Sequence, residues 1–139
     1  MQIDTSSPFG ARAAARLASE TIVWLTTAGK DGTPHPKPVW FLYLDGDILI
    51  FSRPNTAKLR HIARTPRVSL NLDSDGGGGD IIVLTGAARI DDSAPTSNEI
   101  PAYQEKYRNH IARIGMTPES FAAAYSVAIR ITPEKLSGH

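Results

Sequence analysis

A cationic segment at residues 52–60 is the part of this chain best suited to bind an anion. It reads SRPNTAKLR, which is typical of a strand that ends, turns and begins a helix. The first turn of a helix ordinarily favours acidic side chains, because its free N–H groups carry partial positive charge. Here that turn carries Lys58 and Arg60 with Arg53 just before it, and residues 53–67 hold five Lys or Arg and no acid.

Free helix N–H groups, the hydroxyls of Ser52 and Thr56 and the nearby cations would together bind a phosphate. A local rule broken in this way suggests a functional site. The alternative is a solvated basic helix face, and the residues alone leave both interpretations open.

Proline occupies every other position of residues 34–38, PHPKP, and apolar VWFL follows at 39–42. Alternate N–H groups of a strand point to the same side, so one side of this stretch has no donors. That side must face solvent, a ligand or a gap, or else it protects an edge strand from aggregation. From Val39 onward both faces are apolar, so the strand is expected to pass from an unpaired rim into the core.

The other polar motifs predict no catalytic side chain and no metal site. The four glycines at 76–79 precede a strand and not a helix, so they do not match a phosphate-binding loop, and a mobile lid or a variable hairpin both remain open. The histidines at 35, 61, 110 and 139 lack metal-ligand spacing, and no serine lies in a nucleophile elbow. If the chain is an enzyme, a cofactor is expected to carry the reaction.

The elements that must position these residues follow from periodicity and turn chemistry. Strands are expected at 21–27, 34–44, 48–52, 67–72, 81–90 and 126–132, and helices at 8–19, 55–64, 101–114 and 118–125. The strands are joined mainly by hairpins and short helices, without regular βαβ alternation. This order predicts a mainly β (α+β) fold, a six-stranded antiparallel barrel with peripheral helices, as one domain over residues 1–139.

Composition excludes several classes of protein. The 139 residues are 41% hydrophobic, with a net charge of +1, so the overall charge favours neither nucleic acid nor an acidic membrane. There is no cysteine for a disulfide, a thiolate metal site or a cysteine nucleophile. No signal segment and no apolar run of membrane-spanning length is visible, so a cytoplasmic location is expected.

The order and spacing of these segments resemble the pyridoxamine 5′-phosphate oxidase-like split-barrel superfamily, also described as the FMN-binding split barrel. The resemblance is carried by IVWLTTAGKDGTP at 22–34, PVW at 38–40, DGDILIFS at 45–52, the Lys58 helix, PRVSL at 66–70 and AIRITP at 128–133. It covers nearly the whole chain. Within the superfamily, the short length and the Lys58 segment look most like the deazaflavin-dependent oxidoreductases that use coenzyme F-420. The extra C-terminal substrate-binding residues of true pyridoxamine phosphate oxidases are not found, so that activity is not expected.

The resemblance implies a homodimer with two cofactor sites at the subunit interface. It also assigns roles by position: Pro38, Val39 and Trp40 would line the ring system, Phe51, Ser52 and Arg53 would border the ribityl chain, and Thr56, Lys58 and Arg60 would bind the phosphate. The glycine loop 76–79 would approach from the partner subunit.

The resulting hypothesis is an oxidoreductase that transfers hydride from reduced coenzyme F-420 to a small organic acceptor. One alternative keeps the fold but uses flavin mononucleotide (FMN). Another is a non-catalytic protein that binds flavin or haem, or a basic nucleic-acid binder. The chain has no exposed aromatic row interleaved with cations, so no nucleic-acid partner is expected, and no membrane partner either.

Overall fold

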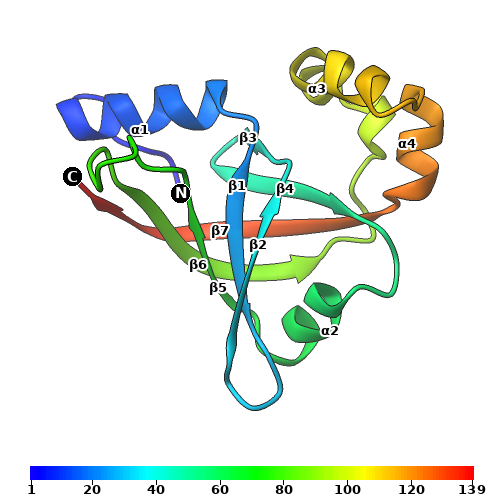
Figure 1. Ribbon diagram of the computed structural model, residues 1–139, viewed down its shortest axis with the longest axis horizontal. Coiled ribbons are helices and arrows are strands. Elements are labelled where there is room, and N and C mark those ends of the chain that lie inside the picture. Colours follow the sequence, from blue (N-terminus) through cyan, green and yellow to red (C-terminus); the bar gives the residue numbers. More distant parts are fainter.

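The strands of the chain form one curled antiparallel sheet. A computed structural model describes all 139 residues, and it places seven strands in the order β2-β1-β5-β6-β7-β4-β3 (Figure 1). The strands are β1 (Val23–Ala28), β2 (Pro34–Val39), β3 (Leu42–Leu44), β4 (Asp47–Ser52), β5 (Arg67–Asn71), β6 (Ile82–Ile90) and β7 (Val127–Gly138). The helices are α1 (Pro8–Ser19), α2 (Ala57–Arg64), α3 (Pro101–Arg113) and α4 (Pro118–Ala124), with a short 3-10 turn at Ser97–Glu99. The expected antiparallel split-barrel fold with peripheral helices is confirmed.

The prediction of six strands is wrong, because the expected strand 34–44 is interrupted at Trp40 and Phe41. Its first part, β2, pairs with β1, and its second part, β3, pairs with β4. The Phe41 N–H donates to the hydroxyl oxygen of Tyr107 at 2.8 Å, and that hydroxyl lies 2.8 Å from the Thr21 carbonyl oxygen. A side chain from α3 therefore takes the place of a strand partner where the chain bends.

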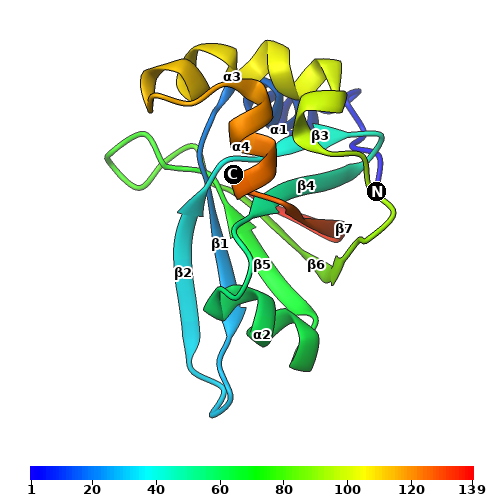
Figure 2. The same cartoon turned by 90° about the vertical axis from the view of Figure 1, so that its right-hand side faces the viewer.

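The unpaired side expected for the proline strand is confirmed. β2 is an edge strand whose only partner is β1, and residues 34–38 are all exposed. The other edge of the sheet is β3, so the two edge strands are consecutive in the chain. Figure 2 shows β2 at the margin of the sheet, with α2 below the barrel and α3 and α4 above it.

The last strand is longer than predicted. β7 continues to Gly138, where residue 132 was expected to be its end, and it pairs with β6 across an irregularity at Thr85 and Gly86. A Cβ on Gly86 would lie 2.1 Å from the Thr132 carbonyl oxygen, so the two backbones approach too closely for a side chain. Pro133 is accommodated opposite Gly86 because strand prolines are tolerated at bulges.

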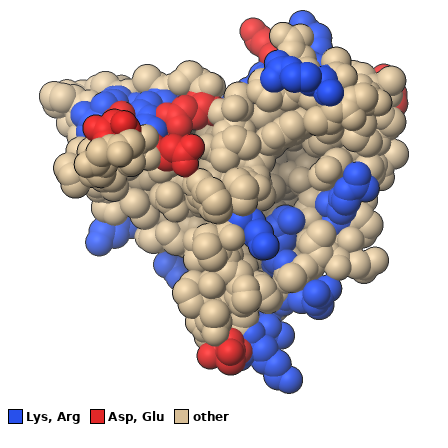
Figure 3. Space-filling model, viewed as in Figure 1, with Lys and Arg blue, Asp and Glu red and all other residues tan.

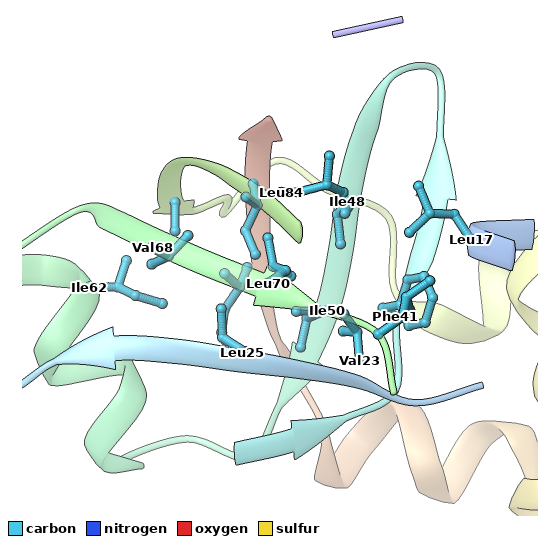
Figure 4. Packing of buried hydrophobic residues seen from close by; sticks show 14 of the residues in the cluster. Leu17, Val23, Leu25, Phe41, Ile48, Ile50, Ile62, Val68, Leu70 and Leu84 are labelled. Carbon is cyan, nitrogen blue, oxygen red and sulfur yellow. The ribbon is translucent and has the colours of Figure 1, made fainter. Parts of the chain in front are cut away.

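Buried side chains form two hydrophobic clusters on the two faces of β4. Ile48 and Ile50 pack into the barrel interior with residues such as Val23, Leu25 and Leu70 (Figure 4). The alternate β4 residues, Leu49 and Phe51, belong to a second cluster under α3 and α4, which also contains Leu42, Ile100, Tyr103, Tyr107, Ile111, Phe121 and Ala128. Because successive strand residues point to opposite faces, Phe51 lies on the helical side of the sheet.

Helix α3 buries one face against the sheet. Tyr103, Tyr107 and Ile111 are buried, whereas Ile114 is 51% exposed because it lies just after the helix ends at Arg113. None of the helices is both long enough and apolar enough to span a bilayer.

We expect Tyr107→Phe to destabilise the fold by about 1–3 kcal/mol, because it removes the acceptor of the buried Phe41 N–H and leaves that group unpaired. Burial also raises the pKa of Tyr107, so the neutral hydroxyl is the relevant form. Urea denaturation monitored by circular dichroism measures the loss. Tyr43→Phe is the matched control, because the Tyr43 hydroxyl only donates at 3.2 Å to the partly buried Met1 carbonyl. Equal losses in the two variants would contradict the role given to Tyr107.

Candidate functional site

A cavity of about 400 Å³ lies where the ends of β2 and β4 meet α2 and α4. Its walls come from four parts of the chain far apart in sequence, and its lining residues are Ile22, Pro38, Val39, Trp40, Phe51, Ser52, Arg53, Thr56, Lys58, Ile114, Phe121 and Tyr125. The face shown in Figure 3 is hollowed below α3 and α4, and Lys and Arg side chains lie along the lower and right edges of the hollow. Small-molecule sites in proteins are commonly cavities of this size, ~300–1,000 Å³.

The structure brings eight of the nine residues predicted to bind a cofactor to this one cavity. They are Pro38, Val39, Trp40, Phe51, Ser52, Arg53, Thr56 and Lys58. Arg60 is not among the lining residues. It is exposed, and its guanidinium donates to the carbonyl oxygen of Asn55 at 2.9 Å. The structure therefore does not place Arg60 in the lining of the cavity.

The polar wall of the cavity is formed by the turn that connects β4 to α2. Asn55 adopts a left-handed conformation with φ 64°, which turns the chain into the helix. Thr56 occupies the N-cap position, but its side chain makes no bond to a helix N–H group. Its Oγ1 lies 3.1 Å from Ser52 Oγ, and Ser52 Oγ donates to the Arg53 carbonyl at 2.8 Å. The first N–H groups of α2 thus have no side-chain cap, and the first turn has no acid.

Lys58 is the cation that this wall leaves without a counter-charge. Its side chain is half-buried, it lines the cavity, and none of the ion pairs of the chain includes it. Burial lowers the pKa of Lys58, and the charge of Lys37 lowers it further. A cation that has lost part of its hydration without gaining a partner is stabilised when an anion binds beside it. The site therefore has the electrostatics of an anion pocket.

The opposite wall is aromatic, and its rings form one nearly parallel column. Trp40 stacks on Tyr107 with centroids 4.9 Å apart and planes 9° apart, and on Phe121 at 5.3 Å and 18°. Phe121 in turn stacks on Tyr125 at 4.4 Å and 16°. The column ends at the polar wall, where the Arg53 guanidinium carbon lies 4.6 Å from the Tyr125 ring centroid. The column covers both faces of the Trp40 ring and joins the two walls.

Sequence reasoning missed this aromatic wall. Ile22, Ile114, Phe121 and Tyr125 line the cavity but were not predicted to do so. A signal was present for two of them, since Phe121 and Tyr125 are four residues apart and share a helix face. The sequence alone does not indicate that this helix face packs against Trp40.

The glycine loop lies at α1, away from the residues that line the cavity of the same chain. Asp80 pairs with Arg12 at 2.7 Å and with Arg16 at 3.1 Å, and the indole N–H of Trp24 donates to Asp73 at 3.0 Å. These ion pairs and this hydrogen bond therefore hold the two ends of the loop against α1 and β1. The predicted approach of this loop to a partner's cofactor remains a prediction.

Two of the histidines that are distant in sequence lie together. The rings of His35 and His61 are 4.8 Å apart, and His61 Nδ1 lies 2.8 Å from the Thr27 hydroxyl. Burial lowers the pKa of His61, and the neighbouring charges of His35, Arg64 and Arg60 lower it further. No group of three or more metal-ligating side chains is present.

The combination of walls defines what the cavity can hold. Uncapped helix N–H groups, two hydroxyls and a lysine suit a phosphate or another compact anion. Both faces of Trp40 and of Phe121 are covered within the column, so this wall offers ring edges, which suit the face of a planar ring because aromatic rings also pack edge to face. A planar heterocycle that carries a phosphate on a flexible chain would satisfy both walls at once.

Comparison with solved structures places the fold among proteins of varied function. A conserved hypothetical protein of Mycobacterium tuberculosis is 24% identical with a TM-score of 0.71, and the alignment covers 97% of this chain and 84% of that one. An F-420 reductase is 20% identical with a TM-score of 0.64, covering 88% and 94%. The haem storage protein HutZ of Vibrio cholerae is 12% identical with a TM-score of 0.63, covering 99% and 95%. No curated protein matches the sequence.

The family model described as pyridoxamine 5′-phosphate oxidase matches residues 9–139, which include every strand of the sheet and every residue of the cavity. The match and the split-barrel architecture agree with the resemblance found in the sequence. The chain therefore belongs to the pyridoxamine 5′-phosphate oxidase family.

Proposed function

We propose that this protein is an oxidoreductase that binds coenzyme F-420 in the cavity and uses its reduced form to transfer hydride to a small organic acceptor. The observation that carries the proposal is Lys58, a half-buried cation without a counter-charge, at the start of α2 and in the same cavity as a stacked aromatic wall. An F-420 reductase has the same fold, which adds support for the coenzyme.

The chain's own residues would bind and orient the coenzyme and exclude water from its ring. Lys58, the Ser52 and Thr56 hydroxyls and the first N–H groups of α2 would hold the phosphate. The ring system would lie against Pro38, Val39 and Trp40, and hydride transfer would be supplied by the bound coenzyme. Positive charge in the pocket favours an anionic reduced ring. No side chain of the cavity is assigned as proton donor, since solvent can serve.

FMN is the second candidate for the same cavity. It shares the planar ring and the phosphate, so the walls alone fit both cofactors. A haem-binding or flavin-binding protein without catalysis is a third candidate, because the haem storage protein HutZ has this fold. Each of the three cofactors has its own visible spectrum, so a titration separates them.

A homodimer is part of the proposal. The outer edge of β2 offers no continuous row of N–H donors, so a partner would contact it through side chains and not by extending the sheet. The mouth of the cavity contains Pro38 and Val39 from this edge. A two-fold partner would then cover the mouth and bring its own glycine loop toward the coenzyme.

Titration of the purified protein with oxidised coenzyme F-420, FMN and haem, followed by fluorescence or absorbance, tests the proposal. We expect micromolar binding of coenzyme F-420 and weaker binding of the other two. Quenching of Trp40 is the structural readout, with Trp40→Phe as the control that separates its emission from that of Trp24. Tight binding of haem without binding of either flavin would contradict the proposed function.

A further inference from the structure

A second cavity, of about 430 Å³, lies between the end of α1, β3 and the first turns of α3. It shares no lining residue with the first cavity, and its lining residues are Leu17, Ala18, Ser19, Thr21, Leu42, Tyr43, Ala102, Glu105 and Lys106. Most of this surface is aliphatic or neutral. Lys106 is its only lysine.

The amine of Lys106 is surrounded by weak partners. Its Nζ lies 3.8 Å from the centroid of the buried Phe41 ring and 5.5 Å from that of Tyr107. Its one hydrogen bond is to the Leu17 carbonyl at 3.4 Å, a long distance for an ammonium donor. No carboxylate lies within ion-pair distance of it. The amine is therefore shielded from water on the Phe41 side without the carboxylate that usually accompanies a shielded ammonium.

This environment makes Lys106 a better nucleophile than a surface lysine. Burial lowers the pKa of Lys106 to about 8, and the negative charge of Glu20 opposes the shift. Roughly a fifth of such amines are neutral at pH 7.4, against about a thousandth for a fully hydrated lysine. The other charged group of the cavity is Glu105, which is exposed, and the Tyr43 hydroxyl is engaged with the Met1 carbonyl.

We propose that Lys106 captures small apolar aldehydes in this second cavity as imines. The neutral Nζ adds to the carbonyl carbon, both N–H protons pass to the carbonyl oxygen, and that oxygen leaves as water while the C=N bond forms. No oxidation or reduction is involved. The imine takes up one proton to become an iminium, which occupies the position of the ammonium over the Phe41 ring and keeps the same cation–π contact.

The walls of the cavity set the class of aldehyde. Leu17, Leu42 and Ala102 offer apolar surface beside the amine, and no second cation is present to receive an anionic substituent. An aliphatic aldehyde of a few carbons would therefore bury its chain here, whereas a phosphorylated aldehyde would gain nothing. The inference is independent of the coenzyme, since the two cavities are separate.

Trapping with borohydride and peptide mass spectrometry tests the proposal on the wild-type protein. After incubation with butanal at pH 7.5, we expect the reduced adduct on Lys106 to exceed that on the exposed Lys30 and Lys135 at least tenfold. The preference should shrink as the pH rises toward 10, because roughly a quarter of each exposed lysine is then also neutral. Formaldehyde, which has no chain to bury, should show a smaller preference for Lys106 than butanal.

Variants separate the site from general reactivity. Lys106→Arg should remove the dominant adduct, and Lys135→Arg, a matched change at an exposed lysine, should leave it. The ratio of the Lys106 adduct to the Lys30 and Lys135 adducts on the wild-type protein tests the proposal even if Lys106→Arg does not fold. Uniform labelling of the lysines, or a Lys106 adduct no larger with butanal than with formaldehyde, would overturn the proposal.

Discussion

Lys58→Ala weakens the binding of coenzyme F-420 at least tenfold, and Lys58→Glu weakens it at least a hundredfold. Lys58 lines the cavity at the start of α2 and has no carboxylate partner, so a bound phosphate would be its only counter-charge. A hydrogen bond to a charged group contributes ~1.5–3 kcal/mol, and each 1.4 kcal/mol is about a tenfold change in affinity. Glutamate adds repulsion between like charges. Isothermal titration calorimetry, or fluorescence titration at low and high salt, measures both losses.

Two arginines on the same helix provide matched controls. Arg64→Ala removes one positive charge from the last turn of α2, where the side chain is exposed, and should change the affinity less than threefold. Arg60→Ala should also have a small effect, because its guanidinium is bonded to Asn55 and does not line the cavity. If all three substitutions weaken binding equally, the effect is one of net charge, and the specific role of Lys58 is wrong.

The sequence predicted the polar wall of the site because its signals are local. Residues 52–58 are contiguous, and a strand end, a turn and a helix start can each be predicted from a few neighbouring residues. The proline pattern of 34–38 is equally local, and it correctly indicated an edge strand. These two segments supply all of the predicted residues that line the cavity except Val39, Trp40 and Phe51, which are adjacent to them in the chain.

The aromatic wall could not be predicted in this way, because its position depends on contacts across the chain. Trp40 stacks between Tyr107 and Phe121, which lie on two different helices. The break that divides β2 from β3 has the same origin, since its backbone is bonded to Tyr107, 66 residues away. The position of Arg60 depends on its side-chain conformation, which helix periodicity alone does not determine.

Phe41→Ala should produce the largest loss of stability among the substitutions considered, about 3–5 kcal/mol, which is the usual cost of removing a buried phenylalanine ring. Phe41 has no exposed surface, and it packs in the barrel interior beside residues such as Leu17 and Ile48. The Lys106 amine also lies over the face of the Phe41 ring. Urea denaturation followed by circular dichroism measures the change in the free energy of unfolding.

Leu44→Ala is the control for that substitution, because Leu44 lies at the end of β3 and is 40% exposed. It should cost less than ~1 kcal/mol, as surface changes usually do. A similar decrease in the free energy of unfolding in the two variants would contradict the view that the packing of the barrel interior depends on Phe41.

Phe41→Ala should also affect the first cavity, because Trp40, which lines that cavity, is the adjacent residue. Trp40 and Phe41 form the break in the strand, and they point into different clusters, one into the aromatic column and one into the barrel. The orientation of Trp40 therefore depends on Phe41 being held on the opposite side of the backbone. We expect folded Phe41→Ala protein to bind coenzyme F-420 more weakly and to show altered Trp40 emission, whereas Leu44→Ala should change neither. Unchanged affinity in the folded variant would mean that the ring column alone fixes Trp40.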